Sequence, residues 1–144
     1  MSSDQNWVQW ASYGHALARN LKDLRFMRGL SQQDLADLAG ISRNQVSNLE
    51  RNENTSTKSS DPVLSTVYKL ARALQVPPAV LLPGVGHNVD IICHPRQGIE
   101  VSFEWPATEE DTMAFQPREL MGRWQGEAPQ WHAAQRSRRE QGKR

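Results

Sequence analysis

The sequence predicts a mainly α-helical fold, in which a helical domain is followed by a small extension with a β-hairpin and a basic tail. Apolar residues recur at helical spacing through residues 13–82. Two short helical patterns between residues 31 and 50 each begin with a capping serine. After residue 98 the periodicity changes to strict alternation, which is typical of a strand with one buried face.

We divide the chain of 144 residues into an N-terminal extension (1–13), a helical domain (14–84), a hairpin-containing extension (85–125) and a basic tail (126–144). The tail is polar and rich in Gln and Arg, so we expect it to be disordered. One cysteine, Cys93, excludes an internal disulfide and provides no metal cluster. Nothing resembles a signal peptide or a membrane span. We expect a cytoplasmic protein without metal or cofactor.

The first helix is predicted from Tyr13 to Met27, and Gly29 ends it. The aromatic residues Trp7, Trp10 and Tyr13 stand at its start. They either extend this helix, lie over the domain or pack on a partner subunit. We prefer the interpretation that they cover part of the core of their own chain.

Two further helices are predicted between residues 31 and 50. Ser31 caps the first, with Asp34 completing a capping box, and Gly40 ends it in a left-handed conformation. Ser42 caps the second, with Gln45 in the corresponding position. Two short helices around such a turn form a helix-turn-helix, which places its second helix in the major groove of DNA. The structural residues are those that hold the two helices at their angle, namely Ala36, Gly40, Ile41, Val46 and Leu49.

The outward residues of the second helix carry no acid, and all can donate hydrogen bonds: Arg43, Asn44, Gln45, Ser47, Asn48 and Arg51. Arg can bind guanine and Asn can bind adenine in a bidentate manner. The alternative is a helical hairpin inside another kind of domain. That alternative does not account for small and apolar residues falling at all the required offsets together.

The segment from about Gly14 to Gly84 resembles the phage-repressor-like, or Xre-type, family of helix-turn-helix transcriptional regulators. The resemblance implies a compact, five-helix, lambda-repressor-like domain whose third helix is the recognition helix. By position it implies that Arg25 and Glu50 form a partly buried salt bridge and that Gln32 contacts a phosphate. It also implies that four residues touch base edges, namely Arg43, Asn44, Ser47 and Asn48.

Three basic residues in or just after the first helix are expected to be solvated or near the DNA backbone, namely Arg19, Lys22 and Arg28. Further phosphate contacts are expected from Gln45 and from the polar loop after residue 50. The loop candidates are Arg51, Asn52 and Lys58, the alternative being a mobile loop of little consequence.

The last helices of the domain follow this loop. Asp61 is predicted to cap a helix with Pro62 at its first position. The buried stripe of that helix is expected to comprise Val63, Leu64, Val67, Leu70, Ala71 and Leu74. Pro77 is predicted to open a short final helix.

Two strands are predicted beyond Gly84, at residues 89–93 and 99–105. A lone hairpin is marginal in water, so its apolar face must cover either the helical domain or a second copy of the chain. We prefer a dimer contact, which would supply the symmetry of two half-sites. Thr108 and Asp111 form another capping box, for a single turn at most.

The net charge of +1 conceals a segregation of charge. Residues 13–84 carry nine basic and six acidic side chains, residues 85–115 carry one and six, and residues 116–144 carry seven and three. Because the charge near the phosphates determines the electrostatic attraction to DNA, the near-neutral total does not argue against binding. The acidic segment is expected to face away from DNA.

No catalytic constellation is visible, so we do not predict an enzyme. On a strand, Cys93 and His94 would point to opposite faces and make a poor nucleophile–base pair. The preferred function is a transcriptional regulator that binds a pseudo-palindromic operator in double-stranded DNA as a homodimer. The alternative is a protein-interaction module, such as an antitoxin or anti-regulator, with secondary DNA binding. No small-molecule effector can be identified from the sequence.

Overall fold

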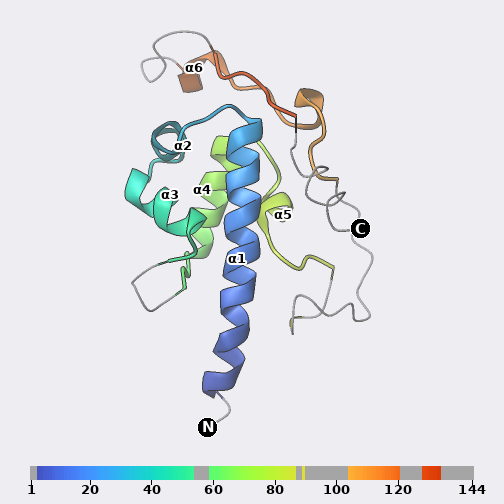
Figure 1. Cartoon of the computed structure of the whole chain (residues 1–144). Helices are drawn as coiled ribbons and strands as arrows, with labels where there is room; N and C mark the ends of the chain where they lie inside the picture. Colours follow the sequence, from blue (N-terminus) through green and yellow to red (C-terminus); the bar gives the residue numbers. More distant parts are fainter. Residues whose placement is uncertain (1–2, 54–58, 87–88, 90–103, 121–127, 134–144) are drawn as a thin grey trace.

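The computed structural model describes residues 3–53, 59–86, 89, 104–120 and 128–133. Its elements are helices α1 (Ser3–Met27), α2 (Gln32–Ala39), α3 (Arg43–Glu50), α4 (Leu64–Leu74) and α5 (Pro78–Leu81), the 3-10 turn η1 (Glu109–Asp111) and helix α6 (Pro117–Leu120). Figure 1 shows α2 to α5 around the C-terminal half of α1, whose first turns extend beyond them. Within the described residues the mainly α-helical class is confirmed.

One apolar core joins all five helices of this domain. It buries Leu residues of α1 at helical spacing against the inner faces of the other helices. Burial of each such side chain contributes roughly 1.5–3 kcal/mol relative to exposure. Its largest fully buried members are Leu21, Leu24, Leu35, Val46, Leu74 and Leu81.

Helix α1 begins at Ser3 rather than at Tyr13, so the aromatic residues extend it. The ring of Trp10 stacks on that of Tyr13 with centroids 6.4 Å apart. The indole Nε1 of Trp10 donates a hydrogen bond of 2.9 Å to the carbonyl of Ser60. Trp10 and Tyr13 therefore pack on their own chain, as preferred among the alternatives, and they tie α1 to the segment before α4.

The predicted start of α4 is wrong by two residues. Val63 has an extended backbone and occupies the N-cap, and no side chain caps the helix, so Asp61 does not serve as the cap. Val63 and Leu64 are each 66% exposed and do not belong to the buried stripe, which begins at Val67. Because the Ser60 carbonyl is bonded to Trp10, a distant contact holds the chain before α4 in place.

Residues 104–120 and 128–133 lie at the C-terminal end of α1 (Figure 1). Trp105, Phe115 and Trp131 are partly buried against the core of the helical domain. The backbone N–H of His132 donates a hydrogen bond of 2.8 Å to the carbonyl of Met27. Residues 128–133, which the sequence places in a disordered tail, therefore pack on the domain, since an indole ring finds apolar surface there.

Arg28 is the centre of this contact and is only 3% exposed, so the expectation of a solvated or DNA-proximal side chain is wrong. Its guanidinium donates to Thr112 Oγ1 (2.6 Å) and to the Met113 carbonyl (2.9 Å). It also lies 4.2 Å from the ring centroid of Phe115. Burial lowers the pKa of Arg28, while the Glu109 carboxylate opposes that change. A cation here joins two distant parts of the chain.

The capping box predicted at Thr108 and Asp111 is present and begins the single turn η1. The Asp111 carboxylate accepts hydrogen bonds from the backbone N–H groups of Thr108 and Ala107, and these bonds lower its pKa. Most of the predicted hairpin, residues 90–103, lies outside the described residues. Trp105, the last alternating residue, packs on its own chain.

Candidate nucleic-acid interface

Helices α2 and α3 begin with reciprocal capping boxes. The backbone N–H of Asp34 donates to Ser31 Oγ (3.1 Å), and the N–H of Ser31 donates to the Asp34 carboxylate (2.9 Å). In α3 the N–H of Gln45 donates to Ser42 Oγ (3.1 Å) and the N–H of Ser42 donates to Gln45 Oε1 (3.0 Å). Each box satisfies two backbone donors at a helix start, so both boundaries are fixed locally.

The turn between them depends on Gly40. This residue has φ 70° and ψ 33°, a left-handed conformation that glycine adopts at little cost. The next residue, Ile41, donates its N–H to the Ala36 carbonyl (3.0 Å) and is partly buried against the core. The chain thereby turns within the three residues between the helices, Gly40 to Ser42, and α3 packs against α2.

The side chains on the inner face of this helix pair are apolar, and they include the small Ala36. Ala36 and Val46 are completely buried and Leu49 is nearly so. The residues that the sequence singles out as structural therefore occupy the α2–α3 junction. Their burial leaves the opposite side of α3 to solvent.

A buried ion pair joins the end of α3 to α1, as the family resemblance implies. Arg25 donates from Nε to Glu50 Oε2 (2.7 Å) and from Nη2 to Oε1 (2.8 Å). Its Nη1 donates to the Leu30 carbonyl (2.9 Å). The two side chains are only 9% and 3% exposed. Such bidentate geometry fixes α3 in orientation as well as in position.

The outer face of α3 presents the four residues expected to touch base edges. Arg43 and Asn44 are exposed and make no side-chain hydrogen bond or ion pair within the described part of the chain. Ser47 and Asn48 are half-buried. The Asn48 side-chain oxygen accepts a hydrogen bond of 2.8 Å from Arg51, so part of its bonding capacity is already used.

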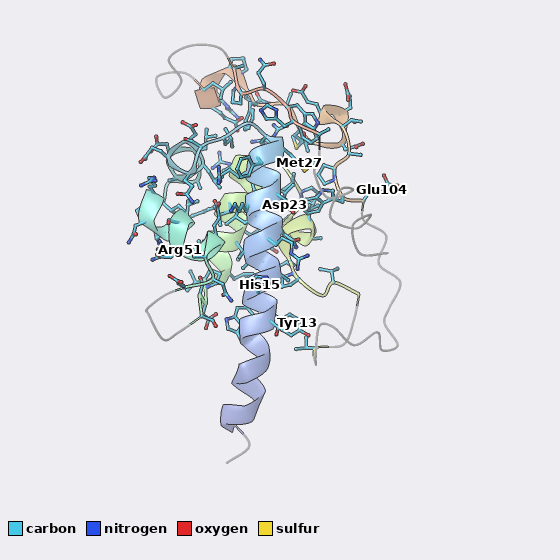
Figure 2. The ribbon with its side chains drawn as sticks, viewed as in Figure 1. Tyr13, His15, Asp23, Met27, Arg51 and Glu104 are labelled. Carbon is cyan, nitrogen blue, oxygen red and sulfur yellow. The ribbon has the colours of Figure 1, made fainter. Side chains whose placement is uncertain are left out.

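The residues expected to contact phosphates differ in exposure and in the groups that already hold them. Gln32 is half-buried at the first position of α2, and Gln45 is exposed, with its side-chain oxygen held by the capping box. Arg51 is exposed and pairs with Glu53 at 3.5 Å. Figure 2 shows Arg51 at the C-terminal end of α3 and Glu104, in the acidic segment, on the other side of α1. Lys58 lies outside the described residues.

Asn52 has a different position from the one expected. Its backbone is left-handed, with φ 53°, and its side-chain amide lies against Gly14 of α1. Any side chain at position 14 would collide with that amide. Asn52 therefore packs between the loop and α1, and its phosphate contact stays a prediction. This pairing is not visible in the sequence, because 38 positions separate the two residues.

A hollow of about 240 Å³ lies beside α3. Gln45 and Asn48 line it together with Pro62 and Thr66, which come from the segment before α4 and from α4 itself. Thr66 was not singled out from the sequence, because its position on another helix hides its proximity to α3. Its hydroxyl adds a polar group at the margin of this surface.

Other kinds of site are not seen in the described ranges. Residues 3–53, 59–86, 104–120 and 128–133 hold no group of three or more potential metal-ligating side chains. Among the same residues, no helix is both long enough and apolar enough to cross a bilayer.

Comparison with known proteins identifies the domain. The family model described as Helix-turn-helix matches residues 21–81, the range from α1 to α5. Residues 21–81 belong to the Xre-type helix-turn-helix family. This helix-turn-helix domain includes both capping boxes, the Gly40 turn and the Arg25–Glu50 pair.

Two similar proteins carry related domains. The HTH-type transcriptional regulator SutR of Escherichia coli (strain K12) is 39% identical over 61 residues, which make up 42% of this chain and 31% of SutR. The chain therefore matches about a third of the length of SutR. The restriction-modification controller protein C.AhdI from Aeromonas hydrophila is 33% identical, and the match covers 48% of this chain and 96% of C.AhdI with a TM-score of 0.43.

Proposed function

We propose that this protein is a sequence-specific, DNA-binding transcriptional regulator that inserts α3 into the major groove. The observation that carries the proposal is the exposed pair Arg43 and Asn44 on a helix whose other face is fully buried. Free guanidinium and amide groups at the start of a helix have the chemistry that binds guanine and adenine edges. The relationship of the domain to that of a transcriptional regulator supports the same function.

Rigid placement of α3 supports base recognition. Direct contacts to base edges require side chains that are held within a fraction of an ångström of the productive geometry. Val46 and Leu49 anchor α3 in the core, and the ion pair of Glu50 with Arg25 fixes its last turn. In this proposal Ser47 and Asn48 extend the base contacts, while Gln32, Gln45, Arg51 and Lys58 provide phosphate contacts.

We further propose that the protein reads a pseudo-palindromic operator as a homodimer. Each chain supplies one α3, so reading two half-sites requires two chains related by a two-fold axis. The two recognition helices would then lie roughly 34 Å apart, one turn of B-DNA. A protein-interaction module is the competing interpretation, and it is less favoured because Trp10, Trp105 and Trp131 contact their own chain.

Selection of bound fragments from a random DNA pool tests this function and returns the half-site, its spacing and its symmetry. With that site in hand, Arg43→Ala should weaken specific binding by ~1–3 kcal/mol and leave random DNA nearly unaffected. Arg19→Ala, which removes an exposed arginine from α1, is the matched control. Equal losses on both DNAs would contradict base recognition by Arg43, and no enriched sequence would contradict the function itself.

Two measurements test the finer parts of the proposal. Light scattering coupled to gel filtration should give the mass of a dimer, and a monomer bound to a single half-site would contradict the symmetric model. Lys58→Ala should reduce affinity for all sequences alike and flatten the dependence on salt, as expected for a phosphate contact.

A further inference from the structure

The segment after the helix-turn-helix domain forms one wall of an open pocket. Residues 112–115 are held in place by buried Arg28, which bonds to Thr112 and Met113 and lies under the ring of Phe115. The side chain of Gln75, at the end of α4, donates a hydrogen bond of 3.1 Å to Glu119 of α6. These contacts fix α6 against the domain, so the space between them has defined walls.

This pocket has a volume of about 450 Å³. Ligand pockets for small molecules have volumes of roughly 300–1,000 Å³, with apolar walls and a few convergent polar groups. Leu38 of α2, Ala73 of α4 and Phe115 supply the apolar part of the lining, and the rest of the lining is polar. Arg72 of α4 and Arg118 of α6 supply the cations.

The charged groups of the pocket that are left to bind a ligand are the guanidinium groups of Arg72 and Arg118. Neither guanidinium makes a hydrogen bond or an ion pair within the described residues. The one carboxylate in the lining, Glu119, is already bonded through both oxygens, to the Gln75 side chain and to the backbone N–H of Gln116 (2.8 Å). Two arginines from different elements thus line one pocket without a carboxylate partner.

An adjoining pocket of about 650 Å³ shares Arg72, Gln75, Arg118 and Glu119 but adds the carboxylates Glu110 and Asp111. Those two charges add to the charge of Glu119, which lines both pockets, and disfavour an anion on that side. The adjoining pocket also has apolar lining residues, among them Val76 and Met113. The smaller pocket lacks the two carboxylates and places Leu38 and Phe115 beside the two arginines, so it is the side that suits an anion with an apolar part.

We propose that the smaller pocket binds a small organic carboxylate with a compact apolar body. The carboxylate would lie between Arg72 and Arg118, whose planar guanidinium groups match its geometry, and the apolar body would lie on Leu38 and Phe115. Such a ligand would bridge α4 and α6 and stabilise the packing of the C-terminal segment by linkage. The pocket contains no residue of α3, so this site is separate from the proposed DNA interface.

A titration of the full chain with phenylacetate, followed by ¹H–¹⁵N NMR, tests the proposal. The amide of Leu38 and the side-chain amide of Gln75 should shift in a saturable manner, with a dissociation constant on the order of 1 mM. Arg72→Gln and Arg118→Gln should each weaken binding about tenfold, because each removes one charged hydrogen-bonding group. Arg19→Gln, an exposed arginine away from the pocket, should bind as the parent chain does.

Phenylacetamide, which has the same shape but no charge, separates carboxylate recognition from simple apolar contact. It should bind at least about tenfold more weakly than phenylacetate. No saturable shift with phenylacetate, equal binding of phenylacetamide, or unchanged binding in both pocket variants would each overturn the proposal. None of these outcomes bears on DNA binding, which is measured separately.

Discussion

Removal of Arg25 is expected to destabilise the domain more than removal of any exposed charge. In Arg25→Met the aliphatic part of the side chain is retained, but the Glu50 carboxylate loses both guanidinium hydrogen bonds. That carboxylate side chain is only 3% exposed, so water replaces little of what is lost. Breaking a buried pair in this way costs roughly 3–5 kcal/mol. For a domain of this size that corresponds to a fall in Tm of about 15–30 °C.

Urea denaturation followed by circular dichroism measures this free energy of unfolding. The matched control is Arg51→Met, because Arg51 pairs with Glu53 at the surface and both side chains are more than half exposed. That variant should lose no more than about 1 kcal/mol.

The double variant Arg25→Met/Glu50→Leu separates a stranded charge from a general loss of packing. It should be more stable than Arg25→Met by at least about 2 kcal/mol, since no unpaired carboxylate is left in the core. The Leu30 carbonyl, which also loses a donor, should keep it below the parent chain. A cost for Arg25→Met no larger than that of Arg51→Met, or a double variant as unstable as the sum of the two singles, would refute this reasoning.

Three further outcomes are expected. Gly29→Ala and Gly40→Ala each impose a left-handed strain of about 1 kcal/mol, but a Cβ at Gly29 also collides with the backbone of Gln130. Gly29→Ala should therefore lower the free energy of unfolding, measured with urea, more than Gly40→Ala does. Equal costs would contradict the packing of residues 128–133 on α1. The pKa of the Asp111 carboxyl, followed by NMR, should lie below that of a free aspartate. Because the pKa is lowered in the folded state, the contribution of this group to stability is present at neutral pH and is lost as the pH falls through the lowered value. An unshifted titration would exclude the backbone hydrogen bonds to this carboxylate. Ser42→Ala should cost about 1 kcal/mol through loss of the α3 cap, and a cost near zero would show that the cap is not formed in solution.

The α2–α3 unit was predictable because its determinants are local. Ser31, Gly40 and Ser42 act on backbone groups within a few positions of themselves, so their effect is visible in the sequence. The outward position of Arg43 and Asn44 then follows from helical spacing around the buried Val46 and Leu49. Helix α4 was less predictable. The pair Asp61–Pro62 has the pattern of a helix start, but α4 begins at Leu64. The chain before α4 is bonded at Ser60 to Trp10, a residue 50 positions away, and such a contact is not visible in a local pattern.

Basic and amide side chains were the hardest to assign, because their chemistry suits both a surface and a buried partner. From the sequence, Arg28 is a basic residue at a helix end and is expected to be solvated. In the structure it donates a hydrogen bond to Thr112, which lies 84 positions further along the chain. Asn52 in a polar loop suggests a phosphate contact, yet Gly14 leaves room for its amide against α1. Arg25 was assigned correctly only through resemblance to a family.

The sequence by itself determined helices α2 and α3, their caps, the glycine turn and the face of α3 that is left to solvent, because periodicity and capping act over distances of one or two helical turns. Only the tertiary structure decided which cations are buried, where the C-terminal segment packs, and that Arg72 and Arg118 line a common pocket. The physical reason is that burial and charge pairing depend on which distant residues meet. That choice is made by the packing of the whole core, and no local pattern encodes it.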